Sequence, residues 1–331
     1  MRDIYLLAAG LLTGVMIPVS TVPQLSAIHA KDNAVVWNPN EDVHAHGIQK
    51  IGSSFEVSFP EASYGGLENL AEASIKPKVQ QVVTRRPTSG RQLYHQRLVE
   101  LKASQPTTNL DENDSLQSLL ISGNKSQLTY EDWKSLLTVE AKAMSRRQGS
   151  HSLGILVGDS LSLWFPPEKL PLGRLWLNQG ISGDTSGGIL KRLSAFSKTK
   201  PDIIYIMAGI NDLRKGTADE VILSNYRRIV HSLRKIHPEA KIFIQSILPT
   251  RLSNIPNHRI RNINYQLALI AQDEGADYLN LYQWFTDFQG NLRKELTTDG
   301  LHLSKEGYDV WQSALQQVES QQNLSNTVMN R

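Results

Sequence analysis

The sequence predicts an α/β fold in which a parallel sheet is covered by helices on both faces. From residue 151 onward, short apolar runs alternate with longer stretches of helical periodicity, which is the pattern of strands joined by helical crossovers. The first run, Leu153–Val157, contains only apolar residues and glycine, as expected for a strand buried on both faces. This part of the chain has about 175 residues, which is ample for one buried core.

Five runs are predicted to be strands and four stretches to be helices. The strands are Leu153–Val157, Leu175–Asn178, Ile203–Met207, Ile242–Ile247 and Tyr278–Leu281. The helices are Ser186–Phe196, Ala218–Ile236, His258–Glu274 and Lys305–Val318. Crossovers between parallel strands are right-handed. We therefore predict a flavodoxin-like three-layer α/β/α sandwich over residues 151–322, with a five-stranded parallel sheet in the order 2-1-3-4-5 and a tail at 323–331.

A further helix is predicted just before this domain, within residues 128–150. Thr129 and Asp132 resemble a capping box in which Asp replaces the usual Glu or Gln. Apolar residues then recur at helical spacing, namely Trp133, Leu136, Leu137, Ala141 and Met144. One apolar face of this kind indicates an amphipathic helix that packs on the following domain.

Residues 31–127 are poorly patterned and are predicted to be a low-order spacer. Proline, glycine and an acidic run interrupt this stretch repeatedly, and no repeat is visible in it. Short helical pieces are expected only at Leu67–Ala73 and Arg91–Leu101.

The first thirty residues have the character of a targeting segment. Between Asp3 and Lys31 there is no Asp, Glu, Lys or Arg, and residues 4–19 are mostly apolar. This run is shorter than the roughly 20 residues that span a bilayer comfortably. Residues 1–30 are therefore predicted to be a signal peptide or a membrane anchor, with a buried helix as the remaining alternative. The first two options imply an extracytoplasmic location, whether secreted, periplasmic or membrane-anchored through residues 4–19.

Composition excludes several kinds of site. The formal net charge is +3, and no compact Lys/Arg stripe with interleaved aromatic residues is visible, so nucleic acid is not an expected partner. The chain has no cysteine, which excludes disulfides, thiolate metal sites and a cysteine nucleophile. No cofactor and no metal are predicted.

Four turns carry the polar residues that point to chemistry. They are Gly158–Ser160, Asn178–Thr185, Ala208–Asp212 and Thr298–Ser304. The first three follow predicted strands and the fourth precedes the last predicted helix. Ligands of open α/β sheets bind beyond the carboxyl ends of the strands, so these turns are expected to form one site.

The residue types in these turns suit nucleophilic catalysis. Serine needs a base to take its proton, and histidine has a suitable pKa for that task. A carboxylate must then orient the imidazole, and Asp299 and His302 can supply both groups from one loop. The candidate oxyanion donors are the N–H of Ser160, a glycine N–H of the second turn and the side-chain amide of Asn211. Asp159 and Asp212 are expected to brace their loops by hydrogen bonds.

The four turns resemble the consensus blocks of the SGNH hydrolases, also called the GDSL family of esterases and lipases. The matching residues are Gly158-Asp159-Ser160-Leu161, Asn178-x-Gly180-x-x-Gly183, Gly209-Ile210-Asn211-Asp212 and Asp299-x-x-His302. The resemblance covers the C-terminal half of the chain and implies an acyl hydrolase with a Ser-His-Asp triad. It implies Ser160 as nucleophile and oxyanion donor, and His302 as base with Asp299 as its orienting group. Gly183 and Asn211 would complete the oxyanion hole.

The expected substrate is a short-chain or O-acetyl ester of a cell-envelope carbohydrate or lipid. No long apolar lid helix is visible between the catalytic turns, and the short segments Phe165–Leu175 and Thr250–Asn257 would rim the pocket. Trp164, Trp176 and Arg214 could line the groove or belong to the core. Three alternatives stay open: a lysophospholipase or thioesterase-type lipase, an O-acyltransferase, and a non-catalytic envelope-binding protein on the same fold.

Overall fold

The computed structural model describes residues 86–104, 110–125 and 127–329. The predicted signal or anchor segment at residues 1–30 and the spacer up to residue 85 lie outside this part of the chain. The central sheet has five parallel strands in the order β2-β1-β3-β4-β5, which confirms the predicted topology. The strands are β1 (Leu153–Gly158), β2 (Leu175–Gly180), β3 (Ile203–Met207), β4 (Lys241–Gln245) and β5 (Asp277–Leu279).

The register of the strands brings the first three turns to the same edge of the sheet. Gly158, the last residue of β1, is paired with Gly180 at the end of β2 and with Met207 at the end of β3. The chain therefore leaves all three strands at one level. The pairing of the strands therefore brings the polar residues that directly follow them close together, whatever contacts their side chains make.

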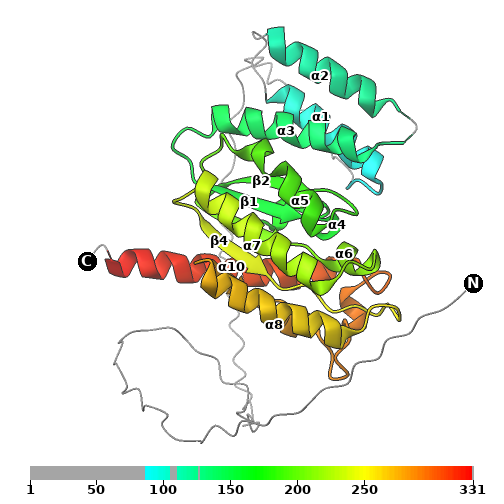
Figure 1. Cartoon of the computed structure of the whole chain (residues 1–331). Coiled ribbons are helices and arrows are strands. Elements are labelled where there is room, and N and C mark those ends of the chain that lie inside the picture. Colours follow the sequence, from blue (N-terminus) through cyan, green and yellow to red (C-terminus); the bar gives the residue numbers. More distant parts are fainter. Residues whose placement is uncertain (1–85, 105–109, 126, 330–331) are drawn as a thin grey trace, which may run out of the picture. The chain divides into compact units, whose positions relative to one another are not determined.

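Helices cover both faces of the sheet (Figure 1). On one face lie α5 (Ser186–Arg192), η2 (Leu193–Phe196), α7 (Asp219–Ile236) and α8 (Asn257–Asp273). On the other lie α4 (Ser160–Leu163), η1 (Pro167–Lys169), α9 (Tyr282–Phe285), η3 (Lys294–Leu296) and α10 (Lys305–Met329). A short helix, α6 (Ile210–Arg214), follows β3. The three-layer α/β/α arrangement is thus as predicted.

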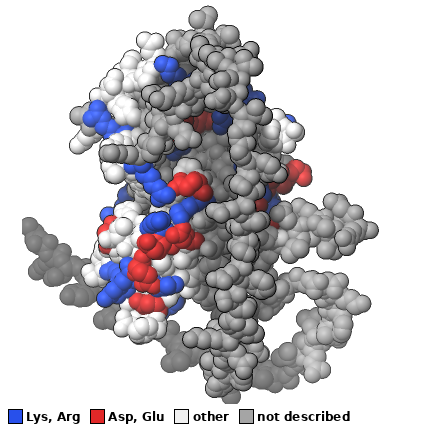
Figure 2. Space-filling view, turned by 180° about the vertical axis from the view of Figure 1, so that it is seen from behind, with Lys and Arg blue, Asp and Glu red and all other residues white. Residues whose placement is uncertain are grey.

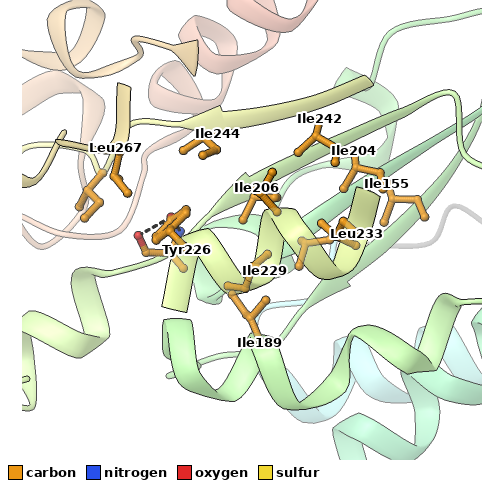
Figure 3. Packing of buried hydrophobic residues seen from close by; sticks show 14 of the residues in the cluster. Ile155, Ile189, Ile204, Ile206, Tyr226, Ile229, Leu233, Ile242, Ile244 and Leu267 are labelled. Atoms are coloured by element: carbon orange, nitrogen blue, oxygen red, sulfur yellow. Dashed lines mark hydrogen bonds between the residues drawn. The ribbon is translucent and has the colours of Figure 1, made fainter. Parts of the chain in front are cut away.

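Alternate residues along each strand supply the two halves of the core. Ile204 and Ile206 of β3 face α7 and α8, whereas Tyr205, between them, belongs to the core on the other face. Figure 3 shows Ile229 and Leu233 of α7 packed against isoleucines of the strands. Burial of one such side chain stabilises the fold by about 1.5–3 kcal/mol. This packing makes the sheet a rigid support for the turns at its edge.

Among the residues that the structure describes, three helices precede the sheet: α1 (Gly90–Ala103), α2 (Leu110–Gly123) and α3 (Tyr130–Arg147). Helix α3 confirms the amphipathic helix predicted within 128–150. The Thr129 hydroxyl accepts a hydrogen bond from the N–H of Asp132, whose carboxylate accepts one from the N–H of Thr129. The predicted apolar face is buried, at Trp133, Leu136, Leu137, Ala141 and Met144.

The prediction of a low-order spacer over 31–127 is wrong at α2 (Leu110–Gly123), whereas the short helix expected at Arg91–Leu101 is confirmed by α1 (Gly90–Ala103). Tyr94, Leu98 and Leu101 of α1 form one apolar face that packs against Trp133 of α3, with the Tyr94 and Trp133 rings edge to face at 5.2 Å. The local sequence pattern indicated this helix only at 91–101. Burial of its apolar face against α3 stabilises the longer helix α1.

The C-terminal helix is longer than predicted, because α10 runs to Met329 and includes most of the predicted tail. Within the described residues, no helix has both the length and the apolarity to cross a bilayer. On the described part of the face in Figure 2, Lys and Arg side chains are interspersed with Asp and Glu, so this surface does not present charge of a single sign.

Candidate active site

Ser160 is placed by a tight connection between β1 and α4. The carboxylate of Asp159 accepts a hydrogen bond from the N–H of Leu161 at 3.0 Å and so caps α4. The turn is close-packed, because a Cβ on Gly158 would lie 2.6 Å from the carbonyl oxygen of Met207. Glycine is therefore needed at Gly158 so that β1 can approach β3 closely just before the serine.

His302 and Asp299 lie in a loop that is closed by its own hydrogen bonds. The N–H of Thr298 donates to the carbonyl of His302 at 3.0 Å, and Thr297 forms an isolated antiparallel bridge with Leu303. Gly300 has a φ of +87°, in the left-handed region that favours glycine. This fold of the loop brings two residues three apart in the sequence to the same side.

The three predicted triad residues are in contact. The Ser160 hydroxyl lies 3.2 Å from Nε2 of His302, and Nδ1 of His302 lies 2.7 Å from Oδ2 of Asp299. A carboxylate only accepts hydrogen bonds, so the His302 proton belongs on Nδ1 and Nε2 is left to accept the serine proton. Partial burial raises the pKa of Asp299, but the hydrogen bonds from His302 and Leu301 outweigh it and hold that pKa below its usual value.

The loop after β2 is fixed by a buried ion pair. Arg192 of α5 donates from Nε to Asp184 at 2.7 Å and from Nη2 to the carbonyl of Gly158 at 3.1 Å. The two side chains of the pair are only 3% and 2% exposed. The second turn is thereby joined to the end of β1. Gly183 in this turn has a φ of +76° with open space where a Cβ would point, so its backbone conformation is what favours glycine.

Asn211 lies where the first three turns meet. Its amide nitrogen donates to the carbonyl of Asp184 at 3.0 Å and is 3.4 Å from the carboxylate of Asp159. Asn211 is therefore joined to the neighbours of Ser160 and Gly183 in the sequence. The hydrogen bonds of the described residues do not join Ser160 directly to Gly183 or to Asn211. The oxyanion role of these three residues stays a prediction.

Two buried aspartates brace these loops, as predicted. The carboxylate of Asp212 accepts hydrogen bonds from the N–H and the hydroxyl of Ser186 at 2.8 and 2.7 Å. Asp159 is 1% exposed. Burial raises the pKa of the Asp159 carboxyl to about 7, an effect reduced by the Leu161 N–H and increased by the nearby Asp184 and Asp212 carboxylates.

Two hollows adjoin these turns. A cavity with room for about one water-sized group is lined mainly by apolar side chains, and its lining includes Asp159, Leu161 and Leu301. The second hollow is a groove of about 1110 Å³ whose lining includes His302, Trp164 and Trp176. The two tryptophans therefore line the groove and also pack against the core, whereas Arg214 donates a hydrogen bond to the Asn211 side chain.

The sequence did not indicate the part that α1 and α3 play in this groove. Arg97 of α1 and Glu140 of α3 both line it and form a largely buried ion pair. An arginine and a glutamate on separate helices form no local motif, so only the tertiary structure reveals their pairing. Among the described residues, no group of three or more His, Asp or Glu side chains is arranged to hold a metal ion.

Comparison with known proteins places the domain in a family. Residues 164–310 match the GDSL-like Lipase/Acylhydrolase family, so this part of the chain is a GDSL-like lipase/acylhydrolase domain. The match includes the second, third and fourth turns and begins four residues after Ser160. The resemblance predicted from the four turns is confirmed at the level of the family.

The individual relatives share less than 30% of their residues with this chain over the matched parts. The chain is 28% identical over 163 residues to an N-acylneuraminate cytidylyltransferase of Streptococcus agalactiae, covering 49% of this chain and 37% of the relative. It is 29% identical over 136 residues to platelet-activating factor acetylhydrolase IB subunit alpha1 of Rattus norvegicus, covering 40% of this chain and 58% of that protein. The chain thus spans less than two thirds of the length of these curated relatives.

A solved structure gives the same fold. It is a protein from Streptococcus pneumonia, proposed to be a platelet activating factor, with a TM-score of 0.52 and 25% sequence identity. The similarity covers 64% of this chain and 99% of the other. The part of the chain that this similarity covers therefore has a fold already observed by experiment.

Proposed function

We propose that this protein is a serine-dependent ester hydrolase that works through Ser160, His302 and Asp299. The observation that carries the proposal is the unbroken series of contacts from the Ser160 hydroxyl through the His302 ring to the Asp299 carboxylate. A role as helix cap would account for a serine directly after a strand. It would not account for an imidazole in contact with that serine and a carboxylate in contact with the imidazole. The family of the domain supports the same chemistry.

In the acylation step, Ser160 Oγ attacks the ester carbonyl carbon while His302 Nε2 takes the serine proton. The imidazolium that forms is stabilised by Asp299, whose carboxylate is 2.7 Å from Nδ1. The C–O bond to the alcohol then breaks, and His302 returns the proton to the leaving alcohol oxygen. Water, deprotonated by His302, attacks the acyl-serine in the second step and releases the acid.

The negative oxygen of each tetrahedral intermediate needs fixed donors, and the proposed ones are the N–H groups of Ser160 and Gly183 and the amide of Asn211. Each such donor contributes about 3–4 kcal/mol to transition-state stabilisation. In the structure the Asn211 amide donates to the carbonyl of Asp184. A shift of this amide toward the intermediate would complete the hole, as catalytic hydrogen bonds often tighten only when substrate is bound.

The small cavity beside the site supports a short acyl group. It has room for about one water-sized group, and residues adjacent in sequence to both Ser160 and His302, namely Asp159, Leu161 and Leu301, line it. An acetyl methyl group is of this size, and a long acyl chain is not. The proposed substrates are therefore acetyl and other short acyl esters. The proposed location outside the cytoplasm rests on the sequence of residues 1–30 alone.

The test is hydrolysis of p-nitrophenyl acetate, butyrate and palmitate by the full chain and its Ser160→Ala variant. We expect acetate to be hydrolysed fastest and the Ser160→Ala change to lower kcat by about 10⁴-fold or more. Ser313→Ala, an exposed serine on α10, is the control and should leave the rate unchanged. A fluorophosphonate should label Ser160 in the wild type only. Full activity of Ser160→Ala, or no labelling of the folded wild type, would contradict the proposal.

A further inference from the structure

The groove beside His302 is larger than the reaction itself requires. Its volume is about 1110 Å³, whereas small-molecule pockets usually have about 300–1,000 Å³. One wall comes from α1, α3 and the residues just before α1, and the other from residues 163–168 and β2. The first wall lies outside residues 164–310, so it does not belong to the part of the chain that matches the family.

This first wall is held firmly against the edge of the sheet. Arg97 of α1 donates from Nε to Glu140 of α3 at 2.9 Å and from Nη2 to the carbonyl of Asn178 in β2 at 2.8 Å. One guanidinium thus joins two helices to a strand. Beneath it, apolar residues of α1 and α3 pack with Leu163, which follows the first turn, and with Ile181 of the second turn. The groove is therefore a preformed part of the fold.

The lining of the groove is mixed in character. Half-buried indole rings of Trp164 and Trp176 line it together with Pro166. Polar side chains line it as well, and on α1 the amide of Gln96 donates to the carboxylate of Glu100 at 2.9 Å. A long acyl chain would leave these polar groups without water or a partner, which costs free energy. A sugar ring has an apolar face for the Trp164 indole and hydroxyl edges for the amide and carboxylate, whereas the Trp176 ring is stacked on Tyr205 and contributes its rim to the groove.

We propose that this groove binds the carbohydrate part of an O-acylated oligosaccharide or polysaccharide, so that the leaving alcohol is a sugar hydroxyl. The inference rests on the proposed esterase function and specifies its substrate. The ester carbon lies at Ser160 and the acyl group in the small cavity, while the neighbouring sugars extend along α1. The bond between the acyl carbon and the sugar oxygen breaks, and that oxygen receives its proton from His302.

The test compares substrates that differ only in the number of sugars. Acetate release is measured from partially O-acetylated xylose and xylohexaose, with p-nitrophenyl acetate as the small reference ester. For the wild type we expect kcat/KM to rise at least about tenfold from xylose to xylohexaose, since each added hydrogen bond contributes roughly 1 kcal/mol. The double variant Gln96→Ala/Glu100→Ala should lose most of this rise and hydrolyse p-nitrophenyl acetate within about twofold of the wild-type rate.

The control is Val99→Ala/Lys102→Ala, which changes two exposed residues of the same helix that do not line the groove. It should behave like the wild type on every substrate. Hydrolysis of p-nitrophenyl acetate without any dependence on sugar number would overturn the inference and leave the esterase proposal intact. The inference would also be overturned if the two double variants lost the dependence of kcat/KM on sugar number to the same extent. A preference for p-nitrophenyl palmitate that Gln96→Ala/Glu100→Ala increases would overturn it as well. Absence of turnover on p-nitrophenyl acetate would overturn both proposals.

Discussion

The two halves of the candidate active site are built in opposite ways. The half that carries the nucleophile is buried: Ser160, Asp159 and Asn211 are 8%, 1% and 4% exposed. The half that carries the base is open, with 41% of the His302 side chain and 53% of the Asp299 side chain exposed. The buried half depends on contacts between distant parts of the chain, whereas the open half is one short loop. One active site can therefore combine a buried nucleophile, held by long-range contacts, with a base and an orienting carboxylate supplied by one exposed loop.

The open half should show the largest effects on activity. His302→Ala removes the base and should lower kcat by about 10⁴- to 10⁶-fold, whereas Asp299→Ala should cost at least about tenfold less. The reason is that a partly exposed His302 can still be solvated and take the proton without its orienting group. Initial rates on p-nitrophenyl acetate give the comparison.

His231→Ala, an exposed histidine on α7, is the matched control and should keep wild-type activity. Equal losses in the two loop variants would show that Asp299 is as essential as His302, and exposure of the histidine would not compensate for loss of its orienting group.

The buried half should show the largest effect on stability. Arg192→Met leaves Asp184 as an uncompensated charge in the interior and should destabilise the fold by about 3–5 kcal/mol. The double variant Arg192→Met/Asp184→Asn removes both charges and should be less destabilised than the single one. The free energy of unfolding in urea is the measurement. If the double variant were less stable than Arg192→Met, the ion pair would not be the cause.

The buried half should also make the free energy of unfolding depend on pH, through the carboxyl of Asp159. Asp159 has a folded-state pKa of about 7, against about 3.9 in an unfolded chain. Between these values the folded state binds a proton that the unfolded state has lost, so the free energy of unfolding falls as pH rises. The loss due to this group should reach about 4 kcal/mol by pH 7.

Asp159→Asn tests this directly because asparagine keeps an acceptor for the N–H of Leu161 and cannot titrate. Urea unfolding at several pH values from 4 to 7 should show the wild type losing stability relative to the variant. Parallel pH profiles for the two proteins would contradict the raised pKa of this carboxyl.

The same contrast explains what could be predicted from the sequence. The strands, the helix α3 and the Asp299–His302 pair are each indicated by a local pattern of residues, and each was found. The contact of Ser160 with His302 joins residues 142 positions apart, yet the position of both residues beside elements of a parallel sheet made it predictable.

The groove wall could not be predicted in this way. The contact of Arg97 with the carbonyl of Asn178 joins residues 81 positions apart and involves a backbone atom, which leaves no trace in the pattern of residue types. Helix α1 was only partly expected because its buried face has just three residues, Tyr94, Leu98 and Leu101, and the residues they pack against lie mainly on α2 and α3.

The guanidinium of Arg97 has a consequence for self-association. Strand β2 is at the edge of the sheet, and an uncovered edge strand offers its backbone carbonyls and N–H groups to the edge of another molecule. Arg97 occupies the outward carbonyl of Asn178, and the Asn178 side chain accepts from the N–H of Gly180. These two backbone groups of β2 are therefore already bonded within the molecule and are not available to the edge strand of another one. A shortened chain without α1 should free the carbonyl of Asn178 and expose the apolar surface of α3 that packs against α1, which should promote aggregation.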